Sequence, residues 1–261
     1  NSRNNGKIGL RPRRQCKRTL LMARSSTAPK DPIAVLFLGL TAFLGFVVAP
    51  VYIARYGASG AEIAVFIFYI MATGLSITAG YHRYFSHGSY RAHPVVKIAY
   101  LLFGAAAFQY SVLSWTALHR VHHRYVDTDA DPTDATKGFF WSYIGWTFSK
   151  LPPLDTSLVP DLMKDRLVVL QHRYYHAVAF FVGLGIPLVL GLTQENFFGM
   201  VLIAGFLRAA LIHHLTFSVT AFGHRYGTRP YETKNSARNS AWLAFFSFGE
   251  GYHNFHHAFP S

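Results

Sequence analysis

Nine histidines, in three clusters and one isolated position, constrain this chain more than any other feature of its sequence. Imidazole is a good nitrogen ligand for iron, zinc or copper, and at pH 7 it is largely neutral and able to bind. Nine imidazoles are too many for one six-coordinate ion, so the sequence predicts more than one bound metal ion. The predicted ligands are His82, His87, His119, His122, His123, His224, His253, His256 and His257.

The spacing within the clusters favours a metal site over scattered histidines. Positions i, i+3 and i+4 share one face of an α-helix, and the two H-x-x-H-H motifs at 119–123 and 253–257 follow that rule. Each triplet is therefore expected to direct three imidazoles at one point from a single turn. His82 and His87 are five residues apart, about 140° around an ideal helix, so they could bind two different ions or flank the end of a helix. A polar helix face explains one such triplet, but two triplets and a pair favour metal binding.

Acidic residues beside the second cluster are candidates to support the ligands. The zincin motif H-E-x-x-H is absent, and Pro132 stands where a calcium-binding EF-hand loop needs glycine. We predict instead that Asp127 and Asp131 accept hydrogen bonds from the free ring N–H groups of ligand histidines. Solvated surface acids are the alternative.

The apolar segments of the chain predict a membrane protein. Of its 261 residues, 51% are hydrophobic and only 14% are charged, which is a low share for a soluble globular protein. A helix that spans a bilayer needs about 20 mostly apolar residues, and residues 33–54 alone would extend about 33 Å. We predict four transmembrane helices, at about 33–54, 61–80, 177–193 and 197–217.

A fifth apolar stretch, residues 95–115, is predicted not to cross the membrane. If it crossed once, the first two histidine clusters would lie on opposite faces of the bilayer and could not share a site. With four spans, all but one of the 25 Lys and Arg residues fall on the histidine side, Arg208 among them. The positive-inside rule makes that side cytoplasmic. Basic residues placed between apolar stretches also explain the net charge of +13 by contact with the membrane rather than with nucleic acid.

The predicted fold is all-α, with four transmembrane helices and a cytoplasmic helical cap that holds a histidine-rich dimetal site. We expect residues 1–32 to form a basic, disordered arm and residues 33–261 to form the membrane domain. A targeting peptide, or sequence upstream of a start at Met22, are alternatives for the arm. Its Cys16 is the only cysteine, which excludes an intrachain disulfide. Because the chain stops four residues after His257, we expect it to continue beyond Ser261.

The histidine motifs resemble those of the membrane fatty-acyl desaturase family. H-x(4)-H, H-x-x-H-H and H-x-x-H-H occur in that order, with a pair of spans between the second and the third. The residues in and around these motifs are similar to those of the Δ9 acyl-CoA or acyl-lipid branch, and nearer to those of its bacterial than of its animal members. This resemblance covers residues 33–261 and rests on G-Y-H-R-Y-F-S-H (80–87), H-R-V-H-H-R-Y-V-D-T-D-A-D-P (119–132), G-F-F-W-S-Y-I-G-W (138–146) and G-E-G-Y-H-N-F-H-H-A-F-P (249–260).

The resemblance implies an enzyme that uses two irons and O2 to insert a cis double bond, at Δ9, into a saturated C16 or C18 acyl chain. The motif histidines would hold the irons, and His224 would complete the set. Electrons would come from an external donor such as cytochrome b5, ferredoxin or rubredoxin, because no flavin or haem motif is visible. The implied location is a bacterial inner membrane, with endoplasmic reticulum or plastid membranes as alternatives.

Some aromatic and polar residues are candidates for the surroundings of the site. Trp115, Trp146 and Phe148 are candidates to line a bent apolar tunnel for the acyl chain, and ordinary core or interface aromatics are the alternative. His214 is a candidate to support the ligands from behind, because an ionisable group near the end of a span needs a partner.

Two positions depart from the family pattern. Four residues before the lone histidine the family usually has Asn, which supports one iron; here the residue is Thr220. Just before the second box the family usually has Asp, often preceded by Arg in acyl-CoA enzymes; here the pair is Ala117-Leu118. The second departure weakens the assignment of the acyl carrier.

Two other classes of protein compete with a desaturase. A di-iron membrane hydroxylase or ketolase would share the metal chemistry, but those families usually carry H-x-x-x-H-H boxes, which this sequence lacks. A non-enzymatic haem protein or metal transporter should place its ligands at mid-membrane along a path. Here the clusters lie at or beyond the ends of the predicted spans, which disfavours transport.

Overall fold

The computed structural model describes residues 29–231 and 233–261. Within these residues the chain is helical, and its β-structure is limited to isolated bridges, for example between Thr228 and Asn239. Most of the predicted basic arm, including Cys16, lies outside the described residues.

Four helices are long and apolar enough to cross a membrane, which confirms the four predicted spans. Each begins earlier or ends later than predicted, and each contains a π-helical segment. The first span, Pro32–Tyr56, joins α2 (Pro32–Phe43), a π-helical segment (Leu44–Val48) and α3 (Ala49–Tyr56), and the second, Gly60–His87, joins α4 (Gly60–Leu75) and a π-helical segment (Ser76–His87). The third span, Tyr175–Thr193, joins α9 (Tyr175–Phe180), a π-helical segment (Phe181–Gly185) and α10 (Ile186–Thr193). The fourth span, Phe197–Phe222, joins α11 (Phe197–Met200), a π-helical segment (Val201–Leu207) and α12 (Arg208–Phe222).

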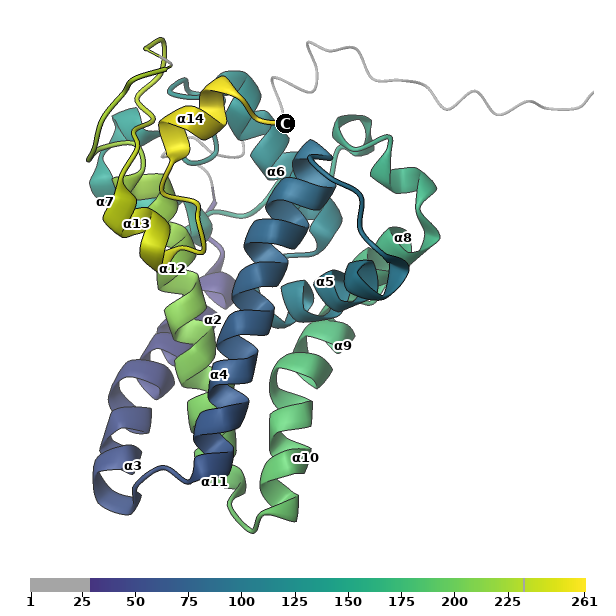
Figure 1. Ribbon diagram of the computed structural model, residues 1–261, viewed down its shortest axis with the longest axis vertical. Coiled ribbons are helices and arrows are strands. Elements are labelled where there is room, and N and C mark those ends of the chain that lie inside the picture. The colour runs from purple at the N-terminus through teal and green to yellow at the C-terminus, as the bar shows by residue number, and fades with distance from the viewer. Residues whose placement is uncertain (1–28, 232) are drawn as a thin grey trace, which may run out of the picture.

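The four long helices form one end of the molecule and the remaining elements form a cap on the other (Figure 1). At the end opposite the cap, Ser59 and Glu62 form a capping box at the start of α4. Glu62 is buried, and its carboxylate also accepts a hydrogen bond of 3.0 Å from the side-chain amide of Asn196, between α10 and α11. Tyr52 donates to the same Asn196 side chain at 2.8 Å. These contacts tie together the two loops at this end of the bundle.

Residues 95–115 do not form a span, as predicted. They are divided between α5 (Pro94–Ala106) and α6 (Val112–Tyr125). With 13 residues, α5 extends about 20 Å, well short of a hydrocarbon core of about 30 Å. The turn between the two helices contains Phe108 and Tyr110 in left-handed backbone conformations, with φ of 56° and 75°. This turn brings α6 back into the cap.

The placement of Arg208 on the histidine side of the membrane was wrong. Arg208 is fully buried in the fourth span, where it donates hydrogen bonds to the carbonyls of Ala106 (2.5 Å), Gly183 (2.7 Å) and Ala204 (3.1 Å). Its guanidinium also lies 5.2 Å from the ring centre of Tyr69. A charged side chain inside a span needs such partners, and here three carbonyl dipoles and an aromatic face provide them.

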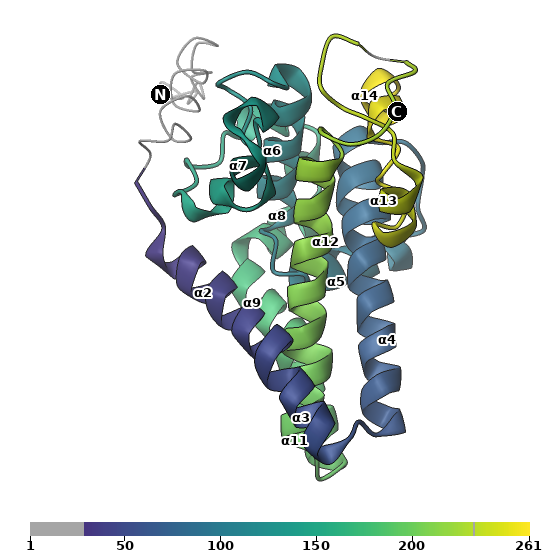
Figure 2. The same ribbon diagram turned by 90° about the vertical axis from the view of Figure 1, so that its left-hand side faces the viewer.

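The cap is built from short helices around the upper ends of α4 and α12 (Figures 1 and 2). Its core includes Tyr81, Phe85, Leu113 and Val168, which pack together with the upper part of α12. The other helical elements are three-residue to four-residue 3₁₀ turns at Ala135–Lys137, Gly145–Phe148, Thr156–Leu158 and Leu162–Lys164, and α7 (Phe139–Tyr143), α8 (Arg166–Arg173), α13 (Ala241–Phe246) and α14 (His253–Ala258).

Candidate metal centre

The first histidine pair lies on the π-helical end of the second span. Backbone hydrogen bonds in a π-helix join residues five apart, so His82 and His87 lie about one turn apart on the same face. The helix ends directly after His87, where Gly88 adopts the left-handed conformation with φ of 64°. The sequence alternative in which the two histidines bind different ions is therefore wrong for this structure, because both belong to one group of imidazoles.

The two H-x-x-H-H triplets lie on α6 and α14, as the spacing predicts, but neither triplet directs its three imidazoles at one point. On α6, His119 and His123 face one group and His122 faces the other; on α14, His256 faces the first group and His253 and His257 face the second. Residues i and i+4 share a helix face more closely than i and i+3 do, and in both triplets the i and i+4 histidines belong to the same group. The expectation that each triplet serves a single point was wrong.

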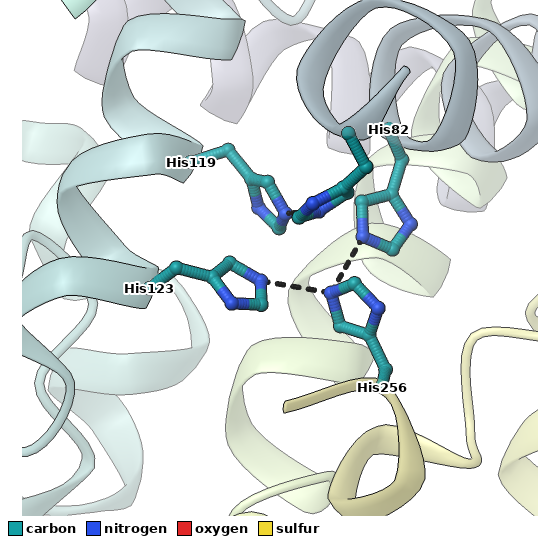
Figure 3. A group of neighbouring side chains, drawn as sticks. His82, His119, His123 and His256 are labelled. Carbon is teal, nitrogen blue, oxygen red and sulfur yellow. Dashed lines mark hydrogen bonds between the residues drawn. The ribbon is translucent and has the colours of Figure 1, made fainter. Parts of the chain in front are cut away.

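All nine predicted histidines thus come together in two groups. In each group the candidate ligand nitrogens lie within 4.8 Å of one another. Figure 3 labels His82, His119, His123 and His256 of the larger group, with His119 and His123 reaching from α6 toward His82 and His256. The five-histidine group is His82, His87, His119, His123 and His256, and the four-histidine group is His122, His224, His253 and His257.

The separations between ring nitrogens fit imidazoles arranged around metal ions. In the five-histidine group, Nε2 of His256 lies 2.9 Å from Nε2 of His82 and 2.8 Å from Nε2 of His123. In the four-histidine group, Nε2 of His253 lies 3.0 Å from that of His224 and 3.2 Å from that of His257. Metal–nitrogen bonds near 2.1 Å place adjacent ligand nitrogens of one ion roughly 3.0 Å apart. Donor type, donor number and spacing therefore fit a metal ion in each group.

Carboxylates determine which nitrogen faces the centre in at least two of these rings. Nδ1 of His122 donates to Oδ1 of Asp131 at 2.9 Å, and Nδ1 of His82 lies 2.5 Å from a carboxylate oxygen of Glu250. A carboxylate only accepts, so the proton is on Nδ1 and Nε2 presents a lone pair. At 3.2 Å from Nε2 of His122, His257 also presents Nε2. Facing lone pairs need a cation between them, which again fits metal binding.

His224 is held by a relay rather than by direct contact with an acid. The hydroxyl of Ser236 donates to Oδ1 of Asp127 at 2.7 Å, so its oxygen is free to accept from Nδ1 of His224 at 2.8 Å. The backbone N–H of Ser236 also donates to Asp127 at 2.5 Å. Asp127 is therefore linked to a ligand candidate, but through Ser236; the direct separation from His224 is 3.9 Å.

Burial keeps most of the imidazoles outside the spans neutral. It lowers the pKa of His119 and of His253 well below 6.5, and neighbouring imidazoles lower both further. It lowers the pKa of His224 to about 4. For His122 burial acts in the same direction, but the carboxylate of Asp131 outweighs it and raises the pKa. Neutral imidazoles are the form that binds metals, so the site is prepared for ions at pH 7.

An apolar pocket of about 370 Å³ lies against both histidine groups. His82 and His119 of the first group and His122 and His253 of the second line it. Most of its other walls are aromatic and aliphatic side chains from α2, α6, α9 and α12. A space of this size and character suits a flexible hydrocarbon chain.

The tunnel candidates divide into two that line this pocket and one that does not. Trp115 lines it and stacks on His119, with ring centres 5.0 Å apart, and Trp146 also lines it. Phe148 is not among the lining residues; it packs on Phe140 at 6.2 Å, and its carbonyl accepts from the N–H of Asp31.

The two remaining candidates for the surroundings of the ligands make other contacts. Thr220 lines the pocket, but its hydroxyl donates to the carbonyls of Ser142 (2.7 Å) and Phe217 (3.0 Å). His214 belongs to neither histidine group; its Nδ1 lies 2.6 Å from the hydroxyl of Tyr143.

Sequence reasoning missed three residues at the site. Glu250 is the first: its carboxylate lies 2.5 Å from Nδ1 of His82, which belongs to the second span and is distant in sequence. Ser236 carries no sequence signal, since its role depends on a loop that returns to Asp127. The third is Gln109, whose side-chain amide donates to Thr216 at 2.9 Å; both residues line the pocket.

Comparison with known proteins agrees with these observations. Residues 59–261 match the family model described as fatty acid desaturase. Acyl-CoA desaturase 1 of Saccharomyces cerevisiae is 39% identical over 198 residues, which are 75% of this chain and 39% of the yeast protein. Stearoyl-CoA desaturase 4 of Mus musculus is 36% identical over 204 residues, 74% of this chain and 57% of the mouse protein. An acyl-CoA Delta-12 desaturase of Tribolium castaneum is 33% identical over 244 residues, 88% of this chain and 65% of the beetle protein.

The four apolar helices and the capped histidine site define an integral membrane protein whose two histidine groups could hold metal ions. The chain belongs to the fatty acid desaturase family, since the family model covers most of its length. It spans about two fifths to two thirds of the length of the relatives named above.

Proposed function

We propose that this protein is an O2-dependent di-iron desaturase that inserts a cis double bond into a saturated C16 or C18 acyl chain, at Δ9. The observation that carries the proposal is the position of both histidine groups on the wall of one apolar pocket. Membership of the fatty acid desaturase family supports the same reaction. The names of the yeast and mouse relatives support an acyl substrate.

The histidines would hold the metal, with one iron in the five-histidine group and one in the four-histidine group. Iron bound there would supply the activation of O2 that is needed to break an unactivated C–H bond, which acids and bases cannot do at pH 7. Glu250 and Asp131 orient His82 and His122 so that their Nε2 atoms face the two centres.

The pocket residues would hold the acyl chain and exclude water. Trp115 places an aromatic face beside His119, so a methylene group that packs on this ring lies next to the five-histidine group. Gln109 and Thr216 tie the turn before α6 to α12 across the same pocket. A polar bridge inside an apolar channel restricts how a chain can bend there, and so helps to select one pair of carbons.

The finer parts of the proposal rest on resemblance. The motifs are most similar to the Δ9 branch, while the beetle relative is named for Delta-12, so the position of the double bond has to be measured. We propose an external electron donor, cytochrome b5, ferredoxin or rubredoxin, and a catalytic unit formed by residues 33–261. We also propose that the metal site faces the cytoplasm of a bacterial inner membrane, with endoplasmic reticulum and plastid membranes as alternatives.

Expression in a desaturase-deficient host tests the function. We expect monounsaturated C16 and C18 acyl chains in total lipid, with the bond located by mass spectrometry of derivatised esters. His256→Ala should abolish the product, whereas His93→Ala, whose side chain caps α5 at the surface, should not. Exclusively hydroxylated or oxo products would move the protein to the hydroxylase or ketolase class. Wild-type-like product from His256→Ala would refute the metal assignment.

A further inference from the structure

The apolar pocket opens on the side of the molecule, between α2 and α9. Three of its lining residues are exposed: Ile33 on α2, and His176 and Phe180 on α9. The other lining residues are buried or half-buried. Figure 2 shows α2 diverging from α12 toward the cap. The open side of the pocket is therefore bordered by two membrane-spanning helices.

The opening lies at the edge of the bilayer. Ile33 is the second residue of the first span, and His176 is the second residue of the third span. Phe180 is four residues farther along α9, about 6 Å deeper. Within the same two helices, Leu36 is 71% exposed and Phe181 is 65% exposed, so the surrounding surface is suited to lipid tails. The opening thus sits where lipid headgroups meet acyl chains.

Three phenylalanines from different elements close the pocket beneath this opening. The ring centre of Phe37 on α2 lies 5.4 Å from that of Phe108 in the α5–α6 turn and 6.3 Å from that of Phe180 on α9. Phe108 and Phe180 are 5.5 Å apart. All three line the pocket. We call Phe37, Phe108 and Phe180 the aromatic sill.

The sill is held firmly on one side and is free on the other. A Cβ atom at Gly183 would lie 2.6 Å from the ring of Phe108, so this ring fits against bare backbone. Arg208 holds the same region by its bonds to Ala106 and Gly183. Phe180, in contrast, is 48% exposed to the lipid side. Phe180 is thus the member of the sill that can rotate away without disturbing the core.

The lining of the pocket also bears on the chemistry of its ligand. Its charged residues, apart from histidines, are Asp31 and Glu250; no Lys or Arg of the described residues lines it. Asp31 sits beside the opening, where its carboxylate caps α2 by accepting from the N–H groups of Ile33 and Ala34. A carrier with several phosphates would meet a carboxylate at this entrance, whereas a lipid can keep its headgroup outside it.

We infer that the pocket takes its acyl chain sideways from the bilayer, through the opening between α2 and α9, so that the substrate is the acyl chain of a membrane-resident lipid. Phe180 controls the width of this entrance. The inference rests on the proposed function only in taking the ligand to be a long acyl chain.

Photolabelling of the full-length protein in vesicles tests this route. The probe is phosphatidylcholine with a diazirine near the middle of one saturated acyl chain, and the readout is the mass-spectrometric yield of adducts on peptides that contain Trp115, inside the pocket. We expect labelling in the wild type, a several-fold higher yield in Phe180→Ala, and a several-fold lower yield in Ile33→Trp. The matched controls are Phe181→Ala and Leu36→Trp, whose side chains lie on the same helices but do not line the pocket; both should label like the wild type.

A second arm distinguishes a soluble carrier. Palmitoyl-CoA with the same diazirine is added from the aqueous side to vesicles without labelled lipid. Labelling of the Trp115 peptide by this probe but not by the lipid would overturn the inference, and so would equal responses of Phe180→Ala and Phe181→Ala, or no pocket labelling by either probe. Labelling does not require turnover. A protein that takes up the lipid chain but makes no double bond would therefore refute the proposed function and leave the entrance in place.

Discussion

Asp131 and His122 form a buried pair in which Oδ1 accepts from Nδ1 at 2.9 Å. The same carboxylate oxygen accepts from the N–H of Thr133 at 2.9 Å, and the other oxygen accepts from the N–H of Asp127 at 3.1 Å. The carboxylate is thereby fixed on the loop after α6, and it fixes the ring of His122 in turn. A loop without regular structure thus sets the direction of a candidate ligand.

Asp131→Asn should weaken metal binding while leaving the fold intact. Loss of a carboxylate behind a ligand histidine typically costs 10-fold to 100-fold in metal affinity. Titration of the purified protein with a competing chelator measures this change. Asp129→Asn is the matched control, because the Asp129 side chain is 85% exposed on the same loop and its ion pair is with Lys137, at 3.7 Å. Equal affinities for the two variants would contradict the role given to Asp131.

Replacing one histidine from each group should remove different metal ions. The rings of His123 and His257 stack with centres 4.4 Å apart, yet His123 belongs to the five-histidine group and His257 to the four-histidine group. We expect two irons per chain in the wild type and about one in His123→Ala and in His257→Ala. Elemental analysis normalised to sulfur gives the ratio, and His93→Ala should keep both ions. One metal or none in a folded wild type would show that the groups do not form two centres.

The sequence was sufficient to predict the spans and the nine histidines, because apolar length and repeated ligand spacing are local properties. It was not sufficient to predict how His119, His122 and His123 divide between two groups, since that depends on the angle between α6 and α14. The shared face of His82 and His87 depends on π-helical geometry, for which an ideal α-helix is the wrong template. Ser236 reaches the site through a tertiary contact that no periodicity encodes.

Acidification should destabilise the metal-free protein. Burial lowers the pKa of His224 to about 4, whereas an unfolded histidine titrates near 6.5. Between these values the unfolded chain binds a proton that the folded chain does not, so stability falls as the pH falls. His119 and His253 shift in the same direction, and only His122 opposes them. Thermal unfolding in detergent from pH 8 to pH 5 measures the trend. A flat profile for the metal-free protein would contradict the burial of neutral imidazoles.

The segment before α5 and the segment between α7 and α8 should be accessible from the same face of the membrane. We expect single cysteines at Ser89, before α5, and Ser157, in the loop before α8, to react with a membrane-impermeant maleimide from the cytoplasmic side, in a background in which Cys16 is replaced by serine. Both side chains are exposed. A cysteine at Gln194, in the exposed loop between α10 and α11, should react only from the opposite side. We expect Ser89 and Ser157 to share a face because α5 covers about 20 Å and cannot cross a core of about 30 Å.

Opposite reactivity of Ser89 and Ser157 would place His87 and His119 on different faces, although their Nε2 atoms lie 2.8 Å apart, and would exclude the dimetal site. If Ser89 and Ser157 both react only from the outer face while Gln194 reacts from the cytoplasm, the site survives and only the proposed orientation is wrong.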